Sequence, residues 1–156
     1  MKYDFQTCSP IDLDDPTLAA CLSLIKRGCA VAIADDELPQ AQLVTVVRAE
    51  GKVIATGAIK RRRPLYARAV AEHAKFPFDE DLLEIGYVAR EPAYRGNNLS
   101  EQIVASLLSR FGSDQLFATT SHPKIKEVLE RAGFERKGEE LAGRKKDVLS
   151  LWIRSK

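Results

Sequence analysis

The chain has 156 residues, of which 45% are hydrophobic and 29% are charged, a composition typical of one globular domain spanning residues 1–156. Its formal net charge is +2, too small to make bulk binding to nucleic acid or to a membrane surface the expected function. No apolar run approaches the ~20 residues that span a bilayer, and residues 1–5 lack the apolar segment of a signal peptide. The composition therefore predicts a cytoplasmic protein with no membrane partner.

Cysteine and histidine are sparse in this sequence. Cys8, Cys21 and Cys29 are odd in number and form no Cys-x-x-Cys pair, and the histidines are His73 and His122. Structural zinc sites need four such ligands, usually closely spaced in pairs. The sequence therefore predicts no metal site and three reduced, mostly structural cysteines.

The first half of the chain alternates strand-like and helix-like segments. Asp14-Asp15-Pro16 indicates a helix start, because Asp caps free N–H groups and Pro suits the first helical position. Gly28 ends this helix, and Glu50-Gly51 lies between two β-rich runs as in a hairpin. The predicted elements are a strand over 1–8, a helix over 14–28, a hairpin over 43–48 and 53–59, and a helix over 64–75.

The second half contains the clearest helix signal of the chain, over 98–111. Its apolar residues recur every four positions, at Leu99, Ile103, Leu107 and Phe111. Asn98, with Glu101 three residues later, predicts a capping box at its start. The other predicted elements are strands over 82–90 and 115–120, a helix from 122 to 133, and strands over 134–138 and 148–153. Strands that alternate with helices predict a mixed sheet covered by helices.

The segment 84–100 combines a strand, a tight basic turn and the first turn of that helix. A helix start offers free N–H groups and a partial positive charge, which together bind phosphate. Arg95 adds a full charge with planar donors, and Gly96 lets the backbone approach a bulky anion. The segment therefore predicts a phosphate-binding turn.

At these residues the chain resembles the GNAT-type N-acetyltransferases. That family carries, after its fourth strand, a loop of the form Arg/Gln-x-x-Gly-x-Gly/Ala that opens a helix. The loop here is Arg95-Gly96-Asn97-Asn98-Leu99-Ser100, after a lead-in of Pro92-Ala93-Tyr94. Asn98 and Ser100 depart from the family's small positions, although Asn is one of the residues that best tolerates unusual backbone geometry.

The resemblance has a second motif, Ala132-Gly133-Phe134-Glu135, because the family often ends its fourth helix with Gly-Phe. The resemblance covers about residues 40–140, and it implies an α/β (α+β) fold. Its central sheet would be mixed and mostly antiparallel, with about six or seven strands and about four flanking helices. The implied cofactor is acetyl-CoA as acyl donor, held by Val88, Ala89, Arg90, Arg95, Gly96, Asn97, Asn98, Leu99 and Ser100.

The implied reaction is acyl transfer from a thioester to an amine. Glu84 lies where several family members carry the general base, and its alternation partners Gly86 and Val88 are small enough to leave room for an acyl group. The alternative is that Glu84 is a solvated charge at a strand end. A main-chain N–H near Val88 is the implied oxyanion donor.

The general acid of the family is missing. Many members carry a Tyr where this chain has Leu129, and His122 replaces an Asn often found near the start of that helix. His122 is a candidate acid, with Ser121 as a second donor; the alternative for His122 is an exposed neighbour of the helix start. A thiol of pKa ~8.5 also leaves without such help.

Three functions remain open from the sequence. The first is an acyl-CoA-dependent transferase acting on a small-molecule or protein amine, whose acceptor wall is predicted within 61–81. The second is a catalytically silent module that binds CoA or another ligand. The third is an RNA-associated protein using the cations at 60–63, which are otherwise a solvated strand end. Trp152 is expected to pack on the sheet, and pairing as a homodimer is left open.

Overall fold

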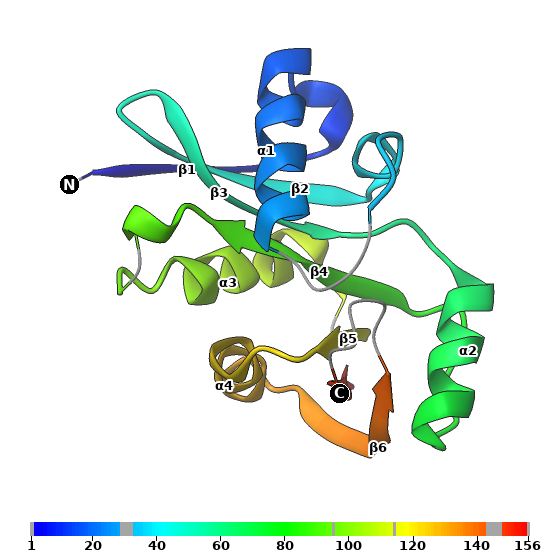
Figure 1. Ribbon diagram of the computed structural model, residues 1–156. Helices are drawn as coiled ribbons and strands as arrows, with labels where there is room; N and C mark the ends of the chain where they lie inside the picture. The colour runs from blue at the N-terminus through cyan, green and yellow to red at the C-terminus, as the bar shows by residue number, and fades with distance from the viewer. Residues whose placement is uncertain (1, 29–32, 95, 114, 143–147, 156) are drawn as a thin grey trace.

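A computed structural model describes residues 2–28, 33–94, 96–113, 115–142 and 148–155 (Figure 1). Within them the chain forms four α-helices and seven strands. The helices are α1 (Asp15–Gly28), α2 (Pro64–Ala74), α3 (Leu99–Phe111) and α4 (Pro123–Arg131). The strands are β1 (Tyr3–Cys8), β2 (Leu43–Ala49), β3 (Lys52–Ile59), β4 (Leu83–Arg90), β5 (Leu116–Thr120), β6 (Glu135–Ala142) and β7 (Val148–Arg154). Every element predicted from the sequence is confirmed, with ends displaced by a few residues.

The strands form one sheet in the order β1-β2-β3-β4-β5-β7-β6. All neighbouring pairs are antiparallel except β4 and β5, which run parallel. A parallel pair needs a crossover rather than a hairpin, and α3 provides it. The predicted mixed, mostly antiparallel sheet with flanking helices is confirmed.

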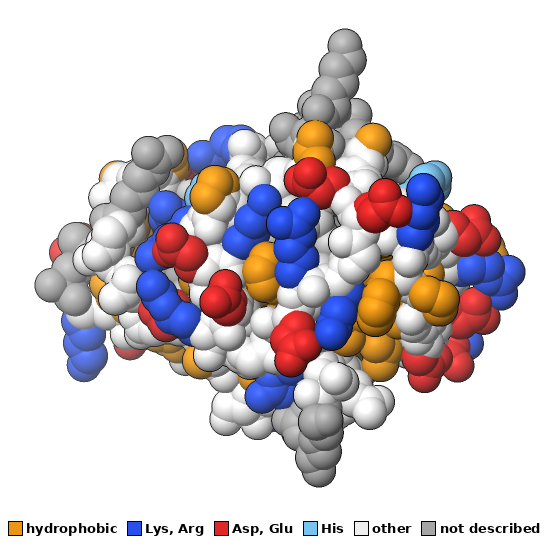
Figure 2. Space-filling model, turned by 90° about the horizontal axis from the view of Figure 1, so that it is seen from below, with side chains coloured by type: hydrophobic (Ala, Val, Ile, Leu, Met, Phe, Trp, Pro, Cys, Tyr) orange, Lys and Arg blue, Asp and Glu red, His pale blue; other side chains and the backbone are white. Residues whose placement is uncertain are grey.

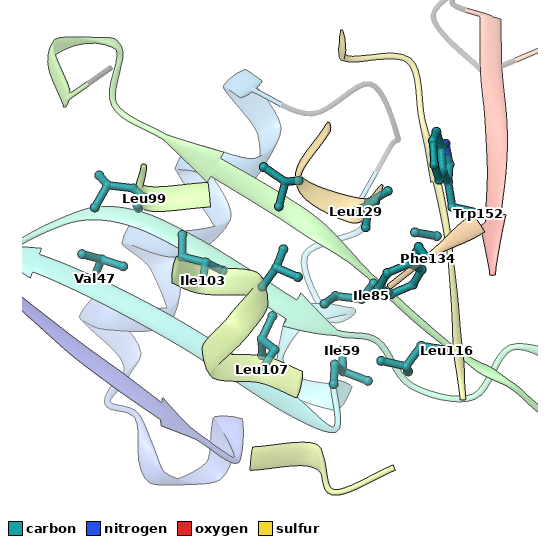
Figure 3. Packing of buried hydrophobic residues seen from close by; sticks show 14 of the residues in the cluster. Val47, Ile59, Ile85, Leu99, Ile103, Leu107, Leu116, Leu129, Phe134 and Trp152 are labelled. Carbon is teal, nitrogen blue, oxygen red and sulfur yellow. The ribbon is translucent and has the colours of Figure 1, made fainter. Parts of the chain in front are cut away.

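The helices cover both faces of this sheet (Figure 1). On one face, α3 and α4 pack on a cluster that includes Ile103, Leu129, Phe134 and Trp152, shown in Figure 3. On the other face, α1 packs against β3 and β4. Helix α2 packs with Phe117 of β5. The neighbours of Phe117 in the chain, Leu116 and Ala118, belong to the α3 cluster. Because side chains alternate along a strand, Phe117 and α2 lie on the opposite face of the sheet, the face that α1 covers. The expected packing role of Trp152 is confirmed; its Nε1 donates to Ser150 Oγ at 2.8 Å.

The start of α3 differs from the prediction. Asn98 stands at the N-cap position with φ 53° and ψ 30°, and its side chain makes no capping hydrogen bond, so the predicted capping box is wrong. An N-cap side chain normally reaches the helix N–H groups from an extended backbone. The left-handed conformation of Asn98 turns its side chain elsewhere, and this conformation is one that Asn tolerates well.

Gly138 in β6 is fixed by a close approach to the end of α2. Its φ is +68°, and a Cβ there would lie 2.3 Å from the carbonyl oxygen of Ala74. We expect Gly138→Ala to lower the free energy of unfolding by at least ~2 kcal/mol, from backbone strain plus overpacking. Urea denaturation measures this. The matched control is Gly112→Ala, which has φ +77° but no atom within 4 Å of the added Cβ and should show the strain alone.

Candidate active site

Strand β4 contains a bulge in its middle. The β3–β4 register moves from Ala58↔Gly86 to Thr56↔Ala89, so two steps on β3 match three on β4. Tyr87 takes the extra place, with φ 54°. Bulges of this kind are common beside active sites, where they redirect side chains. The bulge reverses the alternation beyond it, and Val88 faces α3 near Gly57. The expectation that Val88 shares a face with Glu84 is therefore wrong.

Strands β4 and β5 pair at one end and separate towards the other. Their described pairs are Leu83↔Leu116 and Glu84↔Phe117, after which each strand continues without the other. A cleft of about 650 Å³ opens between them. Its walls are residues 85–90 of β4, residues 118–122 at the end of β5, and Ile125 and Leu129 of α4; Lys60 lines it as well.

A buried ion pair lies at the closed end of this cleft. Lys60 Nζ is 2.9 Å from Glu84 Oε1, and the two side chains are 3% and 4% exposed. The alternative that Glu84 is a solvated strand-end charge is wrong. The approach of Lys60 lacks hydrogen-bond geometry, and Oε1 accepts no hydrogen bond from the described residues. Lys60 Nζ also lies 4.1 Å from the centroid of the Tyr87 ring, a cation–π contact.

A chain of hydroxyl groups reaches the other oxygen of Glu84. Thr119 Oγ1 donates to Glu84 Oε2 at 3.2 Å, and Tyr66 Oη lies 3.4 Å from the same Thr119 oxygen. Because a hydroxyl has one proton, Thr119 accepts from Tyr66. Burial, followed by the nearby charge of Glu84, raises the pKa of Tyr66 to about 12, which keeps this phenol protonated at neutral pH. The carboxylate is thus held in place from α2 and β5 at once.

The residues predicted to bind the cofactor fall in two places. Val88, Ala89 and Arg90 line the cleft wall on β4. Gly96, Asn97 and Asn98 are exposed at the start of α3, whereas the side chains of Leu99 and Ser100 are buried, so a ligand would meet only their main chain. Arg95 lies outside the described residues. At Gly96, where φ is +82°, a Cβ added to the backbone would have no atom of the described residues within 4 Å.

The candidates for the general acid, Ser121 and His122, line the cleft, as does Leu129 at the position of the family's Tyr. His122 is the N-cap of α4, and its Nδ1 accepts a hydrogen bond from the Lys124 N–H at 3.2 Å. This capping role agrees with the structural alternative for His122. Leu129 is buried in the α3 cluster, so no phenol occupies the position of the family's Tyr.

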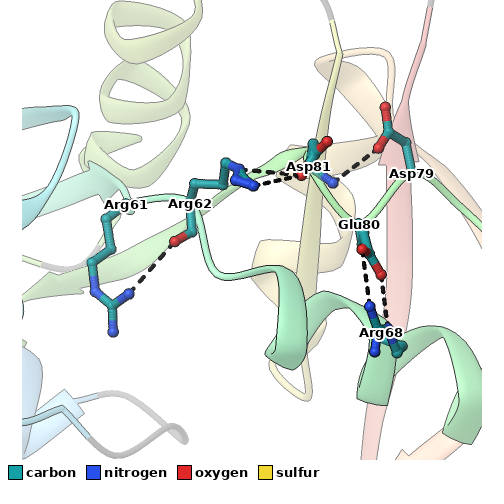
Figure 4. A network of polar contacts seen from close by, with 6 residues as sticks. All are labelled: Arg61, Arg62, Arg68, Asp79, Glu80 and Asp81. Carbon is teal, nitrogen blue, oxygen red and sulfur yellow. Dashed lines mark hydrogen bonds and ion pairs between the residues drawn. The ribbon is translucent and has the colours of Figure 1, made fainter.

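The first cation of 60–63 is buried, and the next two pair with carboxylates at the surface. Lys60 is buried, Arg61 pairs with Glu37 at 2.9 Å, and Arg62 pairs with Asp81 at 3.0 Å. Figure 4 shows the Arg62 and Arg68 contacts with the 79–81 turn. On the face shown in Figure 2, basic and acidic side chains are interspersed. These pairings weaken the case for RNA binding.

Sequence reasoning missed Lys60 and Thr119 as parts of this site. It also placed the acceptor wall within 61–81, none of which lines the cleft. Lys60 follows Ile59, which pairs with Ile85, so the antiparallel register places Lys60 opposite Glu84. Pairing of β3 with β4 in this register would have identified Lys60, but nothing in the sequence marks the register or the bulge.

The described residues offer neither a metal-binding cluster nor a membrane-spanning helix. They contain no group of three or more His, Cys, Asp or Glu side chains placed to hold a metal ion. None of their helices is both long and apolar enough to cross a membrane. Cys8 and Cys21 are free and buried, and burial raises the pKa of both thiols; Cys29 lies outside the described residues.

No protein-family model and no curated protein matches the sequence. Solved structures do match. Escherichia coli ElaA has a TM-score of 0.70 at 14% identity, with 99% of this chain and 100% of that chain covered. A GNAT-family acetyltransferase from Streptococcus agalactiae has a TM-score of 0.69 at 14% identity, covering 97% and 95%. A chain of the NatC complex, solved bound to Gag peptide and CoA, has a TM-score of 0.69 at 15% identity, covering 100% and 99%. The protein therefore has the fold of the GNAT-type N-acetyltransferases.

Proposed function

We propose that the protein transfers an acyl group from an acyl-CoA, with acetyl-CoA as the expected donor, to a primary amine. The observation that carries this proposal is the cleft between the separating β4 and β5, with the Glu84 carboxylate buried behind two of its lining residues, Lys60 and Thr119, at the end where the strands pair. A thioester arm lodged between the strands would present its carbonyl carbon near the bulge. The amine attacks that carbon directly, with no covalent enzyme intermediate.

The chemistry requires a base. An alkyl ammonium has a pKa near ~10.4 and must lose a proton before it attacks. Glu84 lies directly behind Lys60 and Thr119, which both line the cleft, and it accepts that proton directly or through a water. A main-chain N–H near Val88 is the proposed oxyanion donor.

The start of α3 is the proposed phosphate site. This helix has 13 residues, and it begins directly after the exposed Gly96, Asn97 and Asn98. Anions bind such helix starts because free N–H groups and the helix dipole act together. The CoA bound to the NatC complex supports a CoA-type ligand for this fold.

The first test is thermal unfolding with and without acetyl-CoA. At ~100 times its dissociation constant a ligand stabilises by ~2.7 kcal/mol, and each kcal/mol moves the midpoint by ~2–4 °C at this size. We expect the midpoint to rise by roughly 5–10 °C, and scanning calorimetry or a dye-based melt measures it.

Arg95→Ala should reduce that rise, whereas Lys52→Ala, at the exposed start of β3, should not. No rise at millimolar acetyl-CoA would contradict the proposal.

A silent binding module is the second candidate, and the buried Leu129 at the position of the family's Tyr favours it. It predicts the thermal shift without any acylation of added amines. Assays of amine acylation with acetyl-CoA distinguish the two functions.

A further inference from the structure

The proposed reaction gives no role to Lys60, although this side chain lines the cleft. Its amine lies beside Gly86, where a Cβ would be 3.0 Å from Lys60 Cε and 3.3 Å from Nζ. The space that the sequence assigned to an acyl group next to Gly86 is therefore filled by a primary amine. That amine already contacts the carboxylate proposed as the base, at 2.9 Å.

We propose that Lys60 Nζ is itself an acyl acceptor, so that the protein acylates its own cleft. This inference rests on the proposed function, because it needs the same acyl-CoA in the same cleft. The side chain is only 3% exposed, which shields it from reagents in bulk solution. A thioester bound inside the cleft would reach the amine, because Lys60 is one of the residues that line the cleft.

The step balances with an acyl-CoA as the sole co-reactant. Glu84 takes one proton from the Lys60 ammonium, and the amine nitrogen then attacks the thioester carbon. The new C–N bond forms, the C–S bond breaks, and the electron pair leaves on the CoA sulfur. The second proton on nitrogen goes to that thiolate to give CoA thiol, and the first leaves Glu84 for solvent.

The contacts of Glu84 support a reacting amine over a purely structural cation. Thr119 holds Oε2 by a hydrogen bond, so the carboxylate keeps a fixed position when Lys60 loses its charge. Oε1 is the oxygen that Lys60 Nζ approaches at 2.9 Å, so it is placed to take a proton from that ammonium.

The test uses the full chain, acetyl-CoA and no added amine. Cleavage after glutamate releases residues 51–72, whose two lysines are Lys52 and Lys60. Lys52 is exposed at the start of β3, the strand that ends just before Lys60, so it reports simple chemical acetylation in the same peptide. Tandem mass spectrometry over time gives the rate at each lysine.

We expect Lys60 to be acetylated at least ~10-fold faster than Lys52 in the native protein, since base catalysis typically contributes ~10²–10⁴. This preference should disappear in denatured protein and fall in Glu84→Gln. Lys60→Arg should retain the cation and give no modification at that site.

Two negative results are distinguishable. If acetyl-CoA raises the unfolding midpoint but Lys60 reacts no faster than Lys52, the self-acylation is overturned and the proposed function stands. If neither the midpoint nor Lys60 responds to acetyl-CoA, both are overturned.

Discussion

Lys60→Met is expected to lower the free energy of unfolding by ~3–5 kcal/mol, because it leaves Glu84 buried without its counter-charge. At this chain length that corresponds to a fall of roughly 6–20 °C in the unfolding midpoint. The size of the effect follows from burial: the side chains are 3% and 4% exposed, so water cannot replace the lost partner. Thermal and urea unfolding both measure it.

Two controls separate burial from charge loss. Arg62→Met removes a cation from the pair with Asp81, whose side chains are 54% and 60% exposed, and should cost less than ~1 kcal/mol. The double variant Lys60→Met with Glu84→Gln removes both charges and should recover most of the lost stability. Equal losses in the Lys60 and Arg62 variants would contradict a buried pair.

The layout of the fold was predictable because local signals agreed with one another. The apolar stripe of α3, the proline and glycine limits of α1 and α4, and the Glu50-Gly51 turn each mark an element without any tertiary information. The alternation of strands and helices in the second half then restricts the sheet to a mixed one. The ends of the elements differ from the predicted ends by a few residues, because the geometry of a cap is not readable from the sequence. Asn98 illustrates this, since it precedes α3 but makes no capping hydrogen bond.

The site was less predictable because it depends on register. Glu84 and the β4 wall were found from the motif, but the bulge at Tyr87 inserts one residue and reverses which side chains share a face beyond it. Lys60 was assigned to solvent because it opens a run of four cations at 60–63. Only pairing of β3 with β4 shows that the first of these cations turns inward to Glu84 while the next two pair at the surface.

Glu84→Gln is expected to lower the rate of amine acylation by ~10²–10⁴ at neutral pH while acetyl-CoA still binds. The amide has the shape of the carboxylate but cannot take the proton from an incoming ammonium. The rate is measured as CoA thiol released in the presence of an amine, and binding is measured by the thermal shift. The matched control is Glu80→Gln, which removes an exposed carboxylate paired with Arg68 and should leave the rate unchanged.

The pH dependence separates a base from a structural carboxylate. An acceptor amine with a pKa near ~10.4 is mostly protonated at neutral pH, and its neutral fraction rises about tenfold for each pH unit below that value. Without a base, the rate in Glu84→Gln should follow this fraction and recover towards the wild-type rate as the pH rises. A variant that is impaired because its cleft is misfolded would not recover in this way. If the ratio of the Glu84→Gln rate to the wild-type rate stays constant with pH, Glu84 does not act as a base, and its role is only the structural one of pairing with Lys60.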